Sequence, residues 1–420
     1  MTFIAALILV AATAAMDVSL SPNPPVAGQT LTITTDAALL NVSSPMGRWR
    51  QSKSVDSGTA TLELPAGLPL LLVAKVNADG LDEPHAAYTV VTADGKESPR
   101  SSFWLGYLNA GFPSPYPLDG ADTDEAARYA TEAVRLAPDD PVARELLWRI
   151  EAQKATDAAA RTALLQRIDA ELGQRPNGRL AIAAAAIHAM LGDTAGAQAV
   201  ERTHKEIIDT ARSAEEERWT AVGAATSPAR RIELIHDWLA EDPFSSFVPS
   251  LVQILAPSYL AAEGYRSTAV FGLMSLRLMP EDAMTLNGVA FAMAEGGFQF
   301  ERGLVLANRA VSILDTPGAL RRPEGMSDQR WRAVLNEARA ATLDTRGWLQ
   351  TKLGRFDAAQ KSFDEALNLA EKDEFYLHYG LMLKAKGGTA LARDKLRRGL
   401  RLNGPHRAEI RRVLDELEQQ

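Results

Sequence analysis

The sequence feature that most constrains the fold is a pair of glycines seven residues apart, followed by small and large side chains at helical spacing. Gly347 and Gly354 precede Ala359, Phe363 and Ala366, whose offsets of four and three place them on one helix face. Small residues on such a face let a second helix approach closely, and the large residues between them fill the gaps. The segment 343–370 therefore predicts two antiparallel helices packed as a hairpin.

The same unit recurs along the C-terminal half of the chain. Gly380 and Gly387 repeat the interval of seven, and Ala290 and Gly297 occupy the equivalent places in segment 285–313. The later copy has a matching second helix, with Ala392, Leu396, Gly399 and Leu402 at the packing positions. Fainter copies follow one another through residues 121–284. Recurrence at such a period indicates stacked helical hairpins.

These units resemble the tetratricopeptide repeat, whose second helix carries the A-x3-F-x2-A spacing of Ala359, Phe363 and Ala366. The resemblance implies an all-α, TPR-like helical-hairpin solenoid in which the first helix of each repeat lines a concave groove. It also implies binding of a protein partner, without naming that partner. We expect the solenoid to cover residues 121–404.

Two segments depart from the repeat. Residues 314–331 are much longer than an ordinary turn between repeats, and Ser327 is placed to cap a long helix running to about Leu353. Residues 405–420 are amphipathic, with apolar side chains set among Arg and Glu. We expect this last segment to be a C-terminal capping helix, because the final repeat of an array would otherwise expose an apolar face.

The N-terminal part carries strand patterns and few charges. Residues 30–35 and 59–64 alternate apolar and polar side chains, and 70–76 is a continuous apolar run suited to a buried strand. The opening SLSPNPPVAGQTLTIT resembles the first strands of immunoglobulin-like modules on exported bacterial proteins. The predicted fold class is therefore multidomain, with a small N-terminal all-β sandwich over 16–108 and a Pro-rich linker over 109–120 before the solenoid.

The first residues read as a signal peptide. The apolar run 3–16 is too short to span a bilayer, which needs roughly 20 residues. It ends in small residues that offer an A-x-A-like cleavage site. We predict a signal peptide over 1–15 and a mature protein without an integral membrane span, exported to the periplasm or the extracellular medium.

Composition and motifs exclude several classes of function. The 420 residues contain no cysteine, so disulfides, thiolate metal sites and CxxC redox chemistry are excluded. A net charge of −8 argues against nucleic-acid binding. The six histidines form no HExxH or HxH motif, and the chain has no GxxxxGK[ST], GxGxxG or GxSxG motif. We therefore expect a non-enzymatic protein with no catalytic, cofactor or metal site.

The resemblance also points to candidate partner-binding residues. Aligning Ala290, Gly347 and Gly380 makes the next residue of each repeat groove-facing, which gives the apolar stripe Phe291, Trp348 and Leu381. Polar candidates at the rim are Asn287, Asp344 and Lys352. In repeats that clamp a terminal carboxylate, basic residues and Asn occupy such positions. Asp344 and the nearby Glu374 have the opposite sign, which disfavours that subtype.

Three functional classes remain open. The main prediction is an exported scaffold that binds a protein partner, as a peptide or helix, in the groove. The first alternative is an envelope glycan-binding protein acting through the sandwich, where Trp49 and the Phe103, Trp104 and Tyr107 group are the notable aromatics, although a core role fits them better. The second is an accessory relative of exported thioredoxin-like proteins that lacks the CxxC motif.

Overall fold

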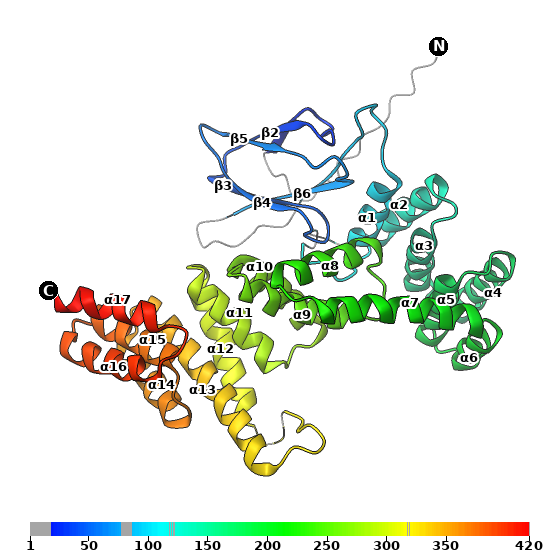
Figure 1. Ribbon diagram of the computed structural model, residues 1–420. Coiled ribbons are helices and arrows are strands. Elements are labelled where there is room, and N and C mark those ends of the chain that lie inside the picture. Colours follow the sequence, from blue (N-terminus) through cyan, green and yellow to red (C-terminus); the bar gives the residue numbers. More distant parts are fainter. Residues whose placement is uncertain are drawn as a thin grey trace. The chain divides into compact units, whose positions relative to one another are not determined.

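A computed structural model gives the architecture of the chain (Figure 1). It describes residues 18–419 except 77–85, 117, 119, 121, 317 and 319, so the predicted signal peptide lies outside the described residues. The chain divides into two compact units, residues 1–248 and 249–420. No helix in the described part of the chain is long and apolar enough to cross a bilayer.

The first unit begins with two antiparallel sheets (Figure 1). Strands β1 (Val18–Ser21), β2 (Thr30–Thr35) and β5 (Thr59–Glu63) form one sheet in the order β1-β2-β5. The other has the order β4-β3-β6-β7 and consists of β3 (Leu39–Ser43), β4 (Arg50–Ser54), β6 (Leu70–Lys75) and β7 (Ala86–Thr89). Apolar side chains of both sheets share one core, which confirms the predicted small β-sandwich.

The local sequence explains these strands. In β2 the alternation leaves Leu31 and Ile33 fully buried, as predicted for a strand with one solvated face. Leu70 to Ala74 of β6 are all fully buried, because one face of the strand joins the sandwich core and the other lies against helix α1. The sequence RQSKS of β4 has no apolar alternation, so its own pattern does not predict a strand.

Eight helices follow the strands in the described part of the first unit. In chain order they are α1 (Pro99–Asn109), α2 (Thr123–Leu136), α3 (Pro141–Lys154), α4 (Ala158–Gln174), α5 (Gly178–Met190), α6 (Thr194–Thr203), α7 (Lys205–Ala224) and α8 (Pro228–Glu241). The sequence predicts sandwich as far as residue 108, but α1 occupies the end of that range. Ser98 caps α1 and Pro99 begins it, so the chain turns helical before the predicted linker. Its Phe103, Trp104 and Tyr107 are buried.

The sandwich is joined to these helices by buried hydrogen bonds. Ser101 Oγ donates to the Pro69 carbonyl at 2.6 Å. The Nδ1 of His236, on α8, lies 2.9 Å from the Met46 carbonyl oxygen in the β3–β4 turn. A carbonyl oxygen only accepts, so Nδ1 carries the hydrogen. Burial, which outweighs this hydrogen bond, and the nearby charge of Arg48 lower the pKa of His236 to about 4. The imidazole is therefore neutral at neutral pH.

The second unit is an array of helical hairpins. Helix α9 (Val248–Ala261) begins where the first unit ends, and the helices that follow are α10 (Tyr265–Leu278), α11 (Ala283–Glu295), α12 (Phe300–Leu314), α13 (Asp328–Lys352), α14 (Phe356–Leu369), α15 (Asp373–Ala385), α16 (Thr389–Leu402) and α17 (Arg407–Glu418). Each odd-numbered helix from α11 contacts the next odd-numbered one, so α11, α13, α15 and α17 form one layer. This is the predicted solenoid arrangement.

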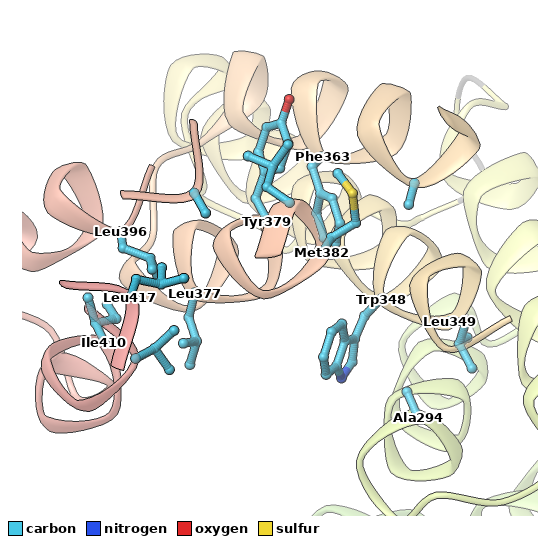
Figure 2. Close-up of a cluster of buried hydrophobic side chains, with 14 of the residues drawn as sticks. Ala294, Trp348, Leu349, Phe363, Leu377, Tyr379, Met382, Leu396, Ile410 and Leu417 are labelled. Carbon is cyan, nitrogen blue, oxygen red and sulfur yellow. The ribbon is translucent and has the colours of Figure 1, made fainter. Parts of the chain in front are cut away.

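Each glycine pair has two separate physical roles. Gly347 and Gly380 lie where helices cross, and a Cβ on them would meet Phe363 at 2.9 Å and Leu396 at 2.5 Å. The second glycine of each pair, Gly354 or Gly387, ends the first helix with a φ of +73° or +88°, which favours residues without a Cβ. Figure 2 shows the side chains that fill the spaces between the hairpins.

The two segments that depart from the repeat also form the elements that the sequence predicts. Ser327 Oγ accepts a hydrogen bond from the Arg330 amide and caps α13, as predicted for the long helix after the insertion. At the C-terminus, α17 packs on α15 and α16. It buries Ile410, Val413, Leu414 and Leu417 in the same core as the preceding hairpins.

Changing Gly380 to Ala is expected to destabilise the α15–α16 hairpin by about 1–3 kcal/mol, because the fully buried Leu396 cannot withdraw from the added methyl group. Gly288→Ala on α11 is the matched control. A Cβ there meets nothing within 4 Å, and we expect a gain of about 0.5–1 kcal/mol. Amide hydrogen exchange of α11, α15 and α16 in the full chain measures both. If the two substitutions changed the stability equally, the close approach of Leu396 to Gly380 would not be the cause of the destabilisation.

The first unit is expected to lose stability as the pH falls from 6.5 through 4. The unfolded chain binds a proton to His236 in this range and the folded chain does not, so folding weakens by up to about 3 kcal/mol. His236→Gln, which keeps an amide donor but does not titrate, should flatten this dependence. Hydrogen exchange of the β3–β4 turn between pH 7 and pH 4 provides the measurement. An unchanged pH profile in His236→Gln would contradict the assignment.

Candidate functional site

Three successive first helices each bring two side chains, four residues apart, to one place in the second unit. They are Phe291 and Glu295 on α11, Asp344 and Trp348 on α13, and Glu374 and His378 on α15. A spacing of four keeps both members of each pair on one helix face, and the contacts between α11, α13 and α15 align these faces. We call these six residues the His378 cluster.

His378 is the centre of the cluster and is buried. Its Nδ1 lies 2.8 Å from Asp344 Oδ2, and its Nε2 lies 3.6 Å from Glu295 Oε1. The indole of Trp348 stacks on the imidazole with 4.8 Å between ring centroids and 8° between planes. Trp348 Nε1 donates to Glu295 Oε1 at 2.5 Å, so the tryptophan also holds this carboxylate in place.

These surroundings favour the charged form of the histidine. Burial opposes the charge, but the carboxylates of Asp344, Glu374 and Glu295 outweigh it and raise the pKa of His378 to about 9. Both ring nitrogens then carry hydrogens, which suits a ring with a carboxylate at each nitrogen. Stacking on Trp348 adds an attraction between the cation and the indole face.

The carboxyl groups of the cluster outnumber its cation. Burial raises the pKa of Glu374, the charges of Asp344 and Glu295 raise it further, and His378 and His406 oppose the rise. His406 Nε2 lies 4.0 Å from Glu374 Oε1. Three carboxyl groups therefore share one buried imidazolium and one more distant imidazole.

The three predicted apolar candidates differ in their placement. Phe291 is half-buried, and its ring centroid lies 6.4 Å from that of His378. Trp348 is only 8% exposed and belongs to the core that continues into α15 and α17 (Figure 2). Leu381 is half-buried and packs against that core. The structure thus brings Phe291 and Trp348 together around His378, with Phe291 the more accessible of the two.

The polar candidates differ in their exposure. Asp344 is 2% exposed, and Lys352 is exposed with its Nζ 4.1 Å from the Trp348 ring centroid. Asn287 is half-buried. Two acceptor oxygens, Asn287 Oδ1 and Asp344 Oδ1, are buried without a hydrogen-bond partner among the described residues. Such acceptors are uncommon in folded proteins and are costly to leave unpaired.

Sequence reasoning missed His378 and Glu295. The repeat alignment placed Leu377 in register with Asn287 and Asp344, one position before His378. Glu295 follows Phe291 by four residues, which is the spacing that separates Asp344 from Trp348. The three i,i+4 pairs lie at different positions of the aligned repeats, so the repeat alignment alone could not group them. A search for catalytic or metal motifs could not find them either, because the members come from three hairpins.

Other buried charged groups also have partners. In the second unit, the carboxylate of Asp373 accepts a hydrogen bond from the His406 backbone amide at 2.7 Å. In the first unit, buried charged groups pair with other side chains. Glu145 accepts from Arg149 and Arg179, and Arg179 also pairs with Asp242, which ties α3 to α5 and to the end of α8. His188 lies between Asp193 and Asp169, with nitrogen–oxygen distances of 2.8 and 3.1 Å. These contacts connect neighbouring helices and account for the buried charges structurally.

A metal site and a sugar-binding surface each need a particular arrangement of side chains. In the described ranges, no group of three or more His, Asp or Glu side chains is arranged to hold a metal ion. Phe103, Trp104 and Tyr107 pack against one another and against Phe244, with Trp104 in contact with both Phe103 and Tyr107. They are at most 3% exposed, so their faces are closed to a sugar ring.

Comparison with known proteins gives the fold only. No protein-family model and no curated protein matches the sequence. Similar solved structures include a thermophilic TPR protein of Thermus thermophilus, with 20% identity over 48% of this chain and 94% of that one, at a TM-score of 0.32. A tetratricopeptide repeat protein from Parabacteroides merdae has 13% identity over 71% and 93%, at 0.33. The yeast Sti1 TPR2AB domain in complex with pHSP90 has 13% identity over 70% and 92%, at 0.23. The hairpin packing described above confirms the predicted tetratricopeptide-like architecture.

The second unit is expected to lose stability as the pH rises from 6.5 through 9. The pKa of His378 is higher in the folded chain than in the unfolded chain, so its contribution is fully present below pH 6.5 and disappears above pH 9. Asp344→Asn removes a charge that raises this pKa, so the titration should move to lower pH. NMR titration of the His378 ring in both proteins measures this. A wild-type titration below pH 6.5 would contradict the assignment.

Proposed function

We propose that the chain is a non-enzymatic, exported scaffold that recognises a protein partner through the first-helix layer of its C-terminal hairpins. The observation that carries the proposal is the convergence of Phe291, Trp348 and three carboxyl groups on one buried histidine, contributed by three successive hairpins. An array that only needed a stable core could fill these positions with apolar side chains, which are often as stabilising as buried charges.

The residues of the His378 cluster and their neighbours have different roles in binding the partner. Trp348, buried and fixed by Glu295 and His378, acts as a rigid base. Phe291 is half-buried beside His378, so its accessible face is available to an apolar side chain of the partner. Leu381 extends the apolar surface along α15, and Asn287, Asp344 and Lys352 supply polar contacts.

Export remains a prediction from the apolar N-terminal run. A role in envelope binding through the sandwich is not proposed, because the aromatic group on α1 is buried in the joint with the helices. The absence of cysteine leaves thiol–disulfide chemistry to other proteins.

Peptide binding provides the test. The full chain should capture a subset of peptides from an array of random sequences. Phe291→Ala should weaken this capture roughly tenfold or more, as expected for an aromatic anchor. Leu391→Ala is the matched control, because Leu391 is an exposed apolar side chain on the second helix α16. Circular dichroism should show equal helical content in all three proteins. Capture that Phe291→Ala leaves unchanged, or no capture at all, would refute the proposal.

A further inference from the structure

The His378 cluster has acceptors that the chain itself does not satisfy. Asp344 is 2% exposed; its Oδ2 accepts from His378, but its Oδ1 has no hydrogen-bond donor among the described residues. On the neighbouring helix α11, the buried Oδ1 of Asn287 also has no hydrogen-bond donor among the described residues. Asn287 and Asp344 occupy equivalent positions in successive repeats, on helices that contact one another. Two unpaired acceptors therefore lie on adjacent helices of one layer.

The charge around these acceptors is negative. Glu295, Asp344 and Glu374 surround one imidazolium, and His406 reaches only Glu374, at 4.0 Å. The field extends to α10, where burial raises the pKa of Tyr265 and four carboxylates raise it further: Glu295, Glu263, Glu409 and Glu374. On α13, Lys352 lies beside the Trp348 ring, with its Nζ 4.1 Å from the ring centroid. The layer therefore has unpaired acceptors, excess negative charge and an accessible aromatic ring.

From this combination we infer that the partner presents an arginine side chain to the His378 cluster, within a peptide segment that also carries apolar residues. This inference rests on the proposed function and specifies the chemistry of the partner. A guanidinium group supplies five donors and a planar face, so one side chain can donate to several acceptors and lie against an aromatic ring. A partner with an acidic anchor would face three carboxyl groups and would be repelled.

The arrangement is opposite in charge to a site that holds a terminal carboxylate. Such a site needs donors at the positions of Asn287 and Asp344. Asn287 has an amide donor, but the carboxylate of Asp344 can only accept. The two unpaired acceptor oxygens are closed to solvent, so an arginine from the partner would donate to the partly exposed carboxylates of Glu295 and Glu374 beside them. An ammonium group would satisfy fewer acceptors than a guanidinium, so lysine should substitute for arginine with lower affinity.

The experiment uses the full chain and an array of random-sequence peptides. Captured peptides should share an arginine, and replacing this arginine with citrulline, which keeps the shape but removes the charge, should weaken binding roughly tenfold or more. Glu374→Gln should weaken binding of the arginine peptide but not of the citrulline peptide, since the two changes remove the same interaction. Glu365→Gln, on the second helix α14 and paired with Arg346, removes an equal charge and should change neither.

The outcomes separate this inference from the proposed function. Captured peptides that depend on Phe291 but have no shared arginine, or that bind equally with citrulline, would overturn the arginine assignment alone. A Glu374→Gln effect on both peptides would also overturn it, because it would not come from pairing with the guanidinium. An array without any Phe291-dependent capture would refute both proposals.

Discussion

Close approach of paired helices is the constraint on which the second unit depends. Gly347 meets Phe363 and Gly380 meets Leu396 at distances that leave no room for a Cβ. This contact sets the separation of the two helices in each hairpin, and so sets which residues of α11, α13 and α15 face one another. The six residues of the His378 cluster come together because three hairpins stack with similar packing, with Ala290 in the first hairpin at the position of Gly347 and Gly380. The site is therefore a product of the repeat geometry and needs no special loop.

Two buried histidines show how the same side chain serves opposite electrostatic roles. His236 faces a carbonyl oxygen and a nearby arginine, so burial keeps it neutral. His378 faces carboxyl groups, which together overcome a similar burial and keep it charged. The first arrangement makes a neutral joint between a turn of the sandwich and a helix. The second stores a fixed positive charge inside an acidic layer, which holds the carboxylates in place without neutralising all of them.

Short sequence patterns predicted the helices and strands whose formation depends on residues close together in the chain. The glycine pairs, the cap at Ser327 and the apolar run 70–76 each predicted an element that the structure contains. The polar strand β4 was missed because its pairing with β3, and not its own sequence, makes it a strand. Helix α1 lay in a range assigned to the sandwich, because its aromatic residues fit a β core equally well. The alignment of repeats found Phe291, Asp344 and Trp348, but their meeting point at His378 depends on stacking that no single repeat encodes.

The contact between His378 and Glu295 has a mechanical consequence. It joins α15 to α11 across the intervening α13, whereas the packed interfaces join each first helix only to the next. A bend or twist distributed over two hairpin interfaces therefore accumulates at this ion pair and at the contact between the Phe291 and His378 rings. The pair opposes opening of the array, and because His378 is buried and the two groups are close, salt weakens this resistance far less than it weakens exposed ion pairs.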